Sequence, residues 1–245
     1  MKGENGSIPA FARDILQTLE GAGHEAYCVG GCVRDTLLGR TPGDWDITTS
    51  ARPEETLALF GADALPTGLR HGTVTVRRPD GSAEVTTFRR DGDYTDHRHP
   101  ESVAFTDSLT EDLARRDFTV NAMALSLRGE LRDPFHGRED LAAGRIRCVG
   151  EPARRFGEDA LRILRGLRFA AVLGFAIEPE TAAALSAARE DLRAIAPERI
   201  FTEVRKLLAA ERPSAVLREF PEVFGVFWPE LLPMLGYDQR NFHPC

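Results

Sequence analysis

Hydrophobic residues recur at helical spacing at the start of the chain. Phe11, Ile15 and Leu19 predict a helix over residues 9–20, because residues three to four apart share one face of a helix. The apolar run at residues 27–29 suits a buried strand. The chain is therefore expected to begin as a helix followed by a strand.

Further along the first half, strand patterns follow a short helix. Residues 53–60 predict a helix with proline at its first turn. Residues 71–77 and 83–88 predict two strands, and the Arg-Pro-Asp-Gly sequence at 78–81 is typical of a hairpin turn. The first half is thus expected to contain an antiparallel pair of strands.

From about residue 153 the pattern becomes helical throughout. The first helix there has an apolar face made of residues at helical spacing, Leu161, Leu164, Leu167 and Ala171. Further helices are predicted over residues 179–192 and 197–210, and residues 212–234 resemble the start of another helical region. The chain therefore changes from a mixed pattern to an all-helical one.

Composition and charge limit the classes of protein to which the chain belongs. Its 245 residues, 42% of them hydrophobic, are enough for two domains with a sizeable core. The formal net charge of −7 gives no global signal for nucleic acid, so RNA binding needs a local basic patch. No apolar run approaches membrane length, and the start lacks a signal-peptide core. The four cysteines have no zinc or redox spacing, which favours a soluble, cytoplasmic protein.

Two adjacent features carry candidate chemistry. Gly30 and Gly31 lead into a helix that ends near Gly39, and such a turn offers free N–H groups that favour phosphate. Asp44 and Asp46 follow, and on a strand they would present two carboxylates to one side, which suits Mg²⁺. Each feature alone has a simpler interpretation, a turn and a solvated loop respectively. Together they indicate a two-metal nucleotidyl-transfer site.

The combination Gly-Gly-x-x-Arg-Asp followed by Asp-x-Asp resembles the nucleotidyltransferase signature of the DNA polymerase β superfamily. The surrounding residues resemble its branch of class II tRNA nucleotidyltransferases (CCA-adding enzymes) and bacterial poly(A) polymerases, through five motifs over residues 25–208. The resemblance implies an α+β fold, with a catalytic head over residues 1–148 that has a small mixed, mostly antiparallel sheet and flanking helices. An all-α neck over 149–210 and the start of a helical body over 211–245 would follow. Residues 238–245 resemble the entry to the segment that carries an HD domain in many bacterial relatives, and they stop before any HD pair.

Within the head, the resemblance implies further roles. The backbone of the glycine turn, together with Arg34, would hold a triphosphate. Glu84 would supply a third carboxylate beside the aspartate pair, although an exposed strand glutamate is an equally open interpretation. Residues 91–100 match the family's flexible loop, which is thought to assist the switch from adding C to adding A. His97 and His99 in that loop are interpreted as solvated side chains rather than metal ligands.

The sequence Arg-Arg-Asp-Phe-Thr-Val-Asn-Ala at residues 115–122 resembles the family's ribose-recognition motif. Arg116, Asp117 and Asn121 would inherit contacts with the sugar and phosphate and so select ribonucleotides. The alternative is an ion pair at the start of a helix. Residues 133–137 resemble the hinge between head and neck.

Arginines accumulate in the helical region that follows. Residues 145–168 contain seven arginines and three acids, a formal charge of +4, which suggests phosphate groups as partners. By the resemblance, Asp159 and Arg162 would read the base as a protein template, with Arg165 and Arg168 near phosphates. The two base-reading residues are expected on one helix, on the face opposite the leucines. The alternative is a solvated helix face with an ordinary i,i+4 ion pair.

The function implied by the resemblance is template-independent addition of C and A, from CTP and ATP, to the 3′ end of tRNA with release of pyrophosphate. Two Mg²⁺ ions would be held by Asp44 and Asp46. A bacterial poly(A) polymerase, or an enzyme that adds only CC or only A, would share most motifs. A tRNA-binding protein with a dead site would not need both aspartates, and a small-molecule nucleotidyltransferase would leave the ribose and base motifs unexplained. The expected partners are the tRNA acceptor end and nucleoside triphosphates, with no membrane and no obligate protein partner.

Overall fold

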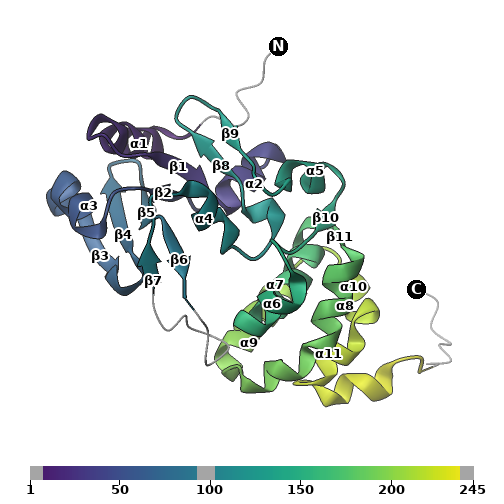
Figure 1. The fold of residues 1–245 in the computed structure, drawn as a ribbon. Coiled ribbons are helices and arrows are strands. Elements are labelled where there is room, and N and C mark those ends of the chain that lie inside the picture. Colours follow the sequence, from purple (N-terminus) through teal and green to yellow (C-terminus); the bar gives the residue numbers. More distant parts are fainter. Residues whose placement is uncertain (1–7, 93–102, 238–245) are drawn as a thin grey trace, which may run out of the picture.

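The computed structural model describes residues 8–92 and 103–237, which form a mixed head followed by a helical remainder (Figure 1). The strands are β1 (Ala26–Val29), β2 (Asp46–Thr49), β3 (Ala64–Gly68), β4 (Thr73–Arg78), β5 (Gly81–Thr87), β6 (Arg89–Asp91), β7 (Val103–Phe105), β8 (Ala124–Ser126), β9 (Leu131–Arg132), β10 (Arg145–Ile146) and β11 (Ala176–Ile177). The α-helices are α1 (Ala10–Gly21), α2 (Gly31–Leu37), α3 (Pro53–Phe60), α4 (Leu109–Ala114), α5 (Gly137–Ala142), α6 (Pro152–Glu158), α7 (Leu161–Leu173), α8 (Pro179–Ala187), α9 (Pro197–Leu208), α10 (Pro213–Glu219) and α11 (Pro221–Gly225). Short 3-10 helices cover Gly61–Asp63, Leu69–His71, Thr119–Asn121, Arg189–Ala194 and Pro229–Met234.

The head is built on a seven-stranded sheet with the order β3-β4-β5-β2-β1-β8-β9. All neighbouring pairs are antiparallel except β2 and β5, which run parallel. The predicted hairpin is present as β4 and β5, joined at Arg78 and Gly81. The predicted α+β fold class, with a mixed and mostly antiparallel sheet, is confirmed.

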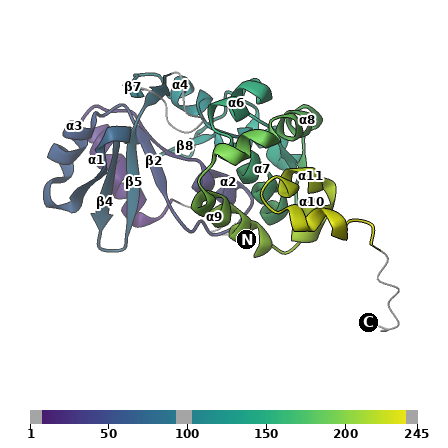
Figure 2. The same ribbon diagram turned by 90° about the horizontal axis from the view of Figure 1, so that it is seen from below.

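Helices α1 and α3 pack against the sheet on the side away from the neck, as Figures 1 and 2 show. The apolar face predicted for α1 is buried, since Ile15 and Leu19 are both fully buried in the core. Helices α6 to α11 lie together at the other end of the molecule (Figures 1 and 2). This arrangement leaves the β1–α2 turn and the start of β2 facing the neck.

Head and neck share one hydrophobic core. The cluster extends from Ile8 in the head to Phe224 in α11. At the junction the ring of Phe118 makes an edge-to-face contact with Phe169 of α7, with 5.9 Å between ring centroids. A Cβ atom at Gly166 would come within 3.0 Å of the same Phe118 ring, so α7 packs directly on the head at this glycine.

Three local predictions were wrong. The helix expected to run from about residue 153 breaks at Asp159, whose backbone is extended (φ −144°, ψ 105°), so α6 and α7 are separate. Asp44 precedes β2 instead of lying on it, because the strand begins at Asp46. The helix expected over residues 179–192 ends at Ala187 and continues as a 3-10 helix.

Other predicted features lie partly or wholly outside the described residues. The loop expected over residues 91–100 is described only at its first two residues, and His97 and His99 lie outside. The segment 238–245 also lies outside. The expected hinge at residues 133–137 joins β9 to α5, and its role stays a prediction. A Cβ atom at Gly137 would lie 2.2 Å from the Thr119 carbonyl oxygen, so this turn is packed tightly.

Candidate active site

The strand-to-helix turn at Gly30 brings the backbone close to two charged side chains. Gly30 has a positive φ of 79°, which a residue with a Cβ atom rarely adopts. A Cβ atom there would lie 3.3 Å from Arg116 Nη1 and 3.9 Å from Asp46 Oδ2. The glycine therefore allows a cation and a carboxylate to meet above the turn.

The aspartate pair lies at the start of β2. Burial is the main cause that raises the pKa of Asp46 above its ordinary value, and the charges of Glu84 and Asp44 add to it against the nearby Arg116. Glu84 occupies the position on β5 directly opposite Asp46 in the parallel ladder. Two further carboxylates therefore act on Asp46 at this edge of the sheet.

The chemistry of these carboxylates suits a hard cation. Within residues 8–92 and 103–237, no group of three or more histidine, cysteine, aspartate or glutamate side chains is arranged to hold a metal ion. Mg²⁺ is commonly bound through one or two carboxylates, with substrate phosphates and water completing its octahedron. Asp44 and Asp46 fit this kind of site, because they supply two oxygen ligands beside a cavity that is rich in cations.

A cavity of about 710 Å³ lies between head and neck and carries a strong positive charge. Its lining includes eight arginines and four aspartates, so it is basic within a chain of net charge −7. The lining residues are Gly30, Gly31, Arg34, Asp44, Asp46, His71, Arg89, Arg115, Arg116, Asp117, Asn121, Asp159, Leu161, Arg162, Arg165, Arg168, Phe169 and Arg199. All the predicted site residues are among them except Glu84, which lines a neighbouring cavity of about 620 Å³ together with Asp44 and Asp46.

A chain of hydrogen bonds crosses this cavity from head to neck. Arg34 Nη1 donates to Asn121 Oδ1 (2.7 Å), and Asn121 Nδ2 donates to Asp117 Oδ1 (3.3 Å). Asp117 Oδ2 accepts from Arg165 of α7, with a shortest N–O distance of 2.6 Å. Burial would raise the pKa of Asp117, but the Arg165 guanidinium and hydrogen bonds from Asn121 and Phe118 N–H outweigh it and hold that pKa below its ordinary value. Asp117 is therefore an anion fixed in place.

The break between α6 and α7 changes how the predicted base-reading residues are held. Asp159 lies in the break, where its Oδ1 accepts from Leu161 N–H (3.0 Å) and its Oδ2 from Arg199 Nη2 (3.2 Å). Arg162, in the first turn of α7, pairs with Glu158 at 2.6 Å and donates to the Arg115 carbonyl oxygen (3.3 Å). Arg162 is only 8% exposed, so the interpretation of this stretch as a solvated helix face was wrong.

Phe169 holds three of the cavity arginines around one ring. The guanidinium carbons of Arg168, Arg34 and Arg165 lie 4.0, 5.2 and 5.5 Å from its centroid. Arg168 also pairs with the buried Glu203 of α9 at 2.6 Å. The three arginines that the resemblance places near phosphates are thus oriented by one ring, and Arg165 and Arg168 are also held by carboxylates.

Several lining residues were not assigned a role from the sequence. Arg199 pairs with Asp159, and Arg115 is held, beside the predicted Arg116, by the fully buried Asp112. The spacing offered a signal for Arg115, because it follows Asp112 by three residues at the end of α4. His71 and Arg89 offered no such signal, since His71 lies in the 3-10 helix Leu69–His71 and Arg89, at the start of β6, reaches the His71 carbonyl oxygen only through a tertiary contact.

Known proteins resemble the chain in sequence and in fold. A family described as "Poly A polymerase head domain" matches residues 26–147, and one described as "Probable RNA and SrmB- binding site of polymerase A" matches residues 174–224. A CCA-adding enzyme of Oceanobacillus iheyensis is 48% identical over 207 residues, which is 84% of this chain and 52% of that protein.

Two solved structures are also similar. The Bacillus stearothermophilus CCA-adding enzyme in complex with CTP matches with a TM-score of 0.80 and 45% identity, over 86% of this chain and 51% of that one. A tRNA nucleotidyltransferase complexed with a primer tRNA and an incoming ATP analog matches with a TM-score of 0.73 and 32% identity, over 87% and 62%. The chain therefore spans about half the length of the relatives that it matches.

Proposed function

Since the chain belongs to the family of the poly(A) polymerase head domain and the CCA-adding enzymes, we propose that it adds C and A to the 3′ end of tRNA. The donors are CTP and ATP, pyrophosphate is released, and no nucleic-acid template is used. Support comes from relatives named as CCA-adding enzymes and from a similar structure that contains CTP. The tRNA acceptor end and the nucleoside triphosphates are the proposed partners.

The observation that carries this function is the cavity that eight arginines line together with the aspartate pair. A triphosphate bears several negative charges, and guanidinium groups bind phosphate oxygens through paired N–H donors. Carboxylates in such a cavity would repel the same phosphates unless a divalent cation lay between them. Two Mg²⁺ ions are therefore proposed at Asp44 and Asp46, where they would offset charge on the reacting phosphoryl oxygens.

The remaining predicted residues take roles according to their place in the cavity. The backbone at Gly30 and Gly31, with Arg34, would bind the triphosphate. Arg165 and Arg168 would supply further phosphate contacts from α7. Glu84, which pairs with Asp46 on the adjacent strand, would orient the attacking 3′-hydroxyl of the RNA from the neighbouring cavity.

The sugar and base would be held between head and neck. Arg116, Asp117 and Asn121 would contact the ribose. Asp159 and Arg162 would read the base, with a carboxylate acceptor and guanidinium donors for the amino group and ring nitrogen that cytosine and adenine share. Support comes from the common cavity that these five side chains line.

The proposed division of the chain is a catalytic head over residues 1–148, a neck over 149–210 and the start of a body over 211–245. The segment matched by the head family, 26–147, supports the first boundary. No described helix is long and apolar enough to cross a membrane. The cytoplasmic location stays a prediction, supported by three free thiols at Cys28, Cys32 and Cys148.

The experiment is incubation of the protein with tRNA that lacks its 3′ CCA, and separately with tRNA that ends in CC, with labelled CTP, ATP or both, followed by sequencing of the products. Products that end in CCA only when both nucleotides are present would support the proposed function. Products that end in CC, a single A, or a run of A would identify the CC-adding, A-adding or poly(A)-forming alternatives. No extension with any nucleotide would contradict nucleotidyl transfer to tRNA.

A further inference from the structure

Asp112 is a charged side chain with no exposure to solvent, and two of the cavity arginines are bound to it. It lies in α4 and is 0% exposed. Arg115 Nε donates to its Oδ1 at 2.9 Å, and Arg116 Nη2 donates to its Oδ2 at 3.3 Å. Burial would raise the pKa of Asp112, yet these two guanidinium groups hold it below its ordinary value. Asp112 is therefore a buried anion between two cations.

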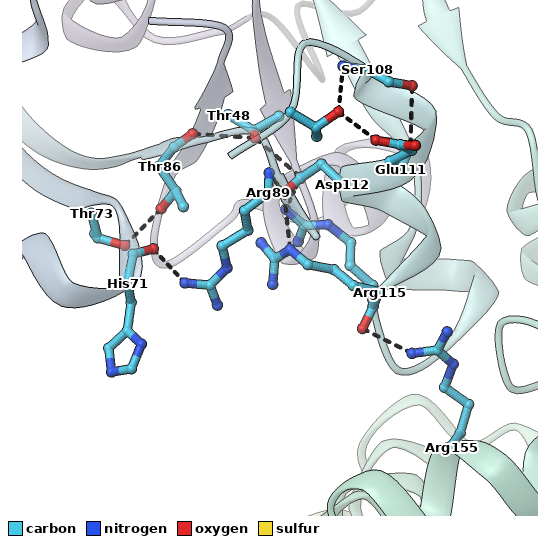
Figure 3. Close-up of polar contacts among 12 residues, drawn as sticks. Thr48, His71, Thr73, Thr86, Arg89, Ser108, Glu111, Asp112, Arg115 and Arg155 are labelled. Carbon is cyan, nitrogen blue, oxygen red and sulfur yellow. Dashed lines mark hydrogen bonds and ion pairs between the residues drawn. The ribbon is translucent and has the colours of Figure 1, made fainter. Parts of the chain in front are cut away.

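The same carboxylate is bonded to β2, the strand that carries Asp46 (Figure 3). Thr48 Oγ1 donates to Asp112 Oδ2 (3.1 Å) and lies within 3.3 Å of the Thr86 carbonyl oxygen. The backbone N–H of Arg89 donates to Asp112 Oδ1 (3.3 Å). Thr48 is two residues after Asp46 on β2, so the two side chains project to the same side of that strand. Asp112 thereby connects the strand of Asp46 to the arginines of the cavity.

Arg116 has few other restraints. Its Nη1 is the atom that a Cβ at Gly30 would meet at 3.3 Å, and its charge opposes the rise in the pKa of Asp46. Its Nε is buried with no hydrogen-bond partner in the part of the chain that the structure describes. The bond to Asp112 is thus what fixes the guanidinium above the glycine turn.

Arg115 connects the same carboxylate to the neck. Its backbone carbonyl accepts from Arg155 Nη1 (3.4 Å) and from Arg162 Nη2 (3.3 Å), while its side chain binds Asp112. Figure 3 shows this path from the sheet through Asp112 and Arg115 to Arg155. The buried Asp112 side chain is therefore linked to the neck through Arg115, without contacting the neck itself.

We propose that Asp112 is a positioning residue for nucleotide binding. It holds the side chains of Arg115 and Arg116 in the cavity and keeps Arg116 close to Asp46. Since this role rests on the proposed function, the substrate concerned is a nucleoside triphosphate. Replacing the carboxylate by an amide removes the charge and one acceptor, so both arginines lose their fixed direction. Nucleotide binding should weaken while the chemical step in the filled site changes less.

The chain offers a matched control in Asp140. It is 2% exposed, accepts from Thr119 Oγ1 (2.8 Å) and pairs with Arg147 at 3.1 Å and Arg145 at 3.6 Å. Like Asp112, it is buried, pairs with two arginines and accepts a hydrogen bond from a threonine. None of these four control residues lines the cavity, so Asp140→Asn should lower stability without changing nucleotide binding.

The test is equilibrium binding of CTP, with Mg²⁺, to the wild type, Asp112→Asn, Asp140→Asn, Arg116→Gln and the Asp112→Asn/Arg116→Gln double variant. Asp112→Asn should raise the Kd of CTP about tenfold, the effect of losing a charge-assisted hydrogen bond, and Asp140→Asn should leave it within about twofold. In the double variant, Kd should be within about threefold of that of Arg116→Gln, because one side chain acts through the other. The KM for CTP should rise with Kd, while kcat stays within about threefold.

Two results would overturn the positioning role: a Kd unchanged in folded Asp112→Asn, or equal weakening in Asp112→Asn and Asp140→Asn. If Asp112→Asn does not fold, Thr48→Val decides, since it removes only the hydroxyl bonded to Asp112. It should raise Kd about two- to threefold, and no change would contradict the role. Incorporation of nucleotides into tRNA by the wild type tests the proposed function, and its outcome does not depend on these ratios of Kd values.

Discussion

Asp46 and Glu84 lie directly opposite each other on β2 and β5, the one parallel pair of the seven-stranded sheet. Asp46 faces the arginine-lined cavity as well as the neighbouring one, whereas Glu84 lines only the latter of these two. The two carboxylates are thus adjacent in the sheet, but only Asp46 also lines the arginine-lined cavity. This separation allows their roles to be distinguished by kinetics.

Glu84→Gln should lower kcat by about a hundredfold if Glu84 orients the attacking hydroxyl, which is the usual range for a group that positions or deprotonates a nucleophile. The KM for CTP should stay within about threefold, because Glu84 does not line the nucleotide cavity. Steady-state incorporation on a tRNA acceptor gives both constants. An unchanged kcat would leave Glu84 as an exposed strand residue.

Asp159→Ala should weaken the preference for CTP over UTP, because UTP presents a carbonyl where cytosine has an amino group. The expected loss of discrimination is about 1–3 kcal/mol, the cost of leaving a charged hydrogen-bonding group unmatched. Single-nucleotide incorporation with each of the four triphosphates measures the ratio. A matched variant, Arg199→Gln, removes the partner of Asp159 and keeps the carboxylate. An unchanged ratio of CTP to UTP in Asp159→Ala would make Asp159 only the ion-pair partner of Arg199.

The Asp117–Arg165 pair should make stability depend on pH in one direction. The pKa of Asp117 in the folded protein lies below its ordinary value of 3.8. A depressed pKa contributes stability that is present above the ordinary value and is lost as the pH falls through the folded-state pKa. At pH 7 the free energy of unfolding of the wild type should therefore exceed that of Asp117→Asn by about 1–3 kcal/mol. This difference is smaller than for a fully buried pair, because the Arg165 side chain is 37% exposed.

Urea unfolding of the wild type and Asp117→Asn at pH 7, 5 and 3 tests this dependence. The difference between their unfolding free energies should be similar at pH 7 and 5 and smaller at pH 3. A difference that is constant down to pH 3 would contradict the ionised pair.

Much of the fold follows from local patterns in the sequence. The helix at residues 10–21, the helix at 53–60 and the hairpin of β4 and β5 have apolar spacing and turn residues that specify them without tertiary contacts. Strands β8 and β9 are short and offered too little pattern. The break at Asp159 was missed because the apolar spacing continues across it, while the bond from Leu161 N–H to the Asp159 carboxylate stabilises a new helix start.

The candidate site was predictable as a set of residues but not as an arrangement. Twelve of the thirteen predicted residues line one cavity, because motifs far apart in the sequence meet between head and neck. The partners of those residues depend on tertiary contacts that no spacing reveals, such as Arg168 with Glu203 or Phe169 with three arginines. Asp112 was overlooked for a related reason, since a lone acidic residue on a short helix is ordinarily solvated.

The measurement that tests the account most directly is incorporation of labelled CMP into tRNA by wild type and Asp46→Asn at saturating CTP and Mg²⁺. Asp46 is at the meeting point of the glycine turn, Arg116 and the other carboxylates, and the proposed reaction requires its charge. Asp107→Asn, at a side chain that is 84% exposed, serves as the control. We expect Asp46→Asn to keep its fold and lose at least about a hundredfold in kcat, while the control keeps wild-type activity. Incorporation at the wild-type rate by folded Asp46→Asn would contradict the assignment of this cavity as the site of nucleotidyl transfer.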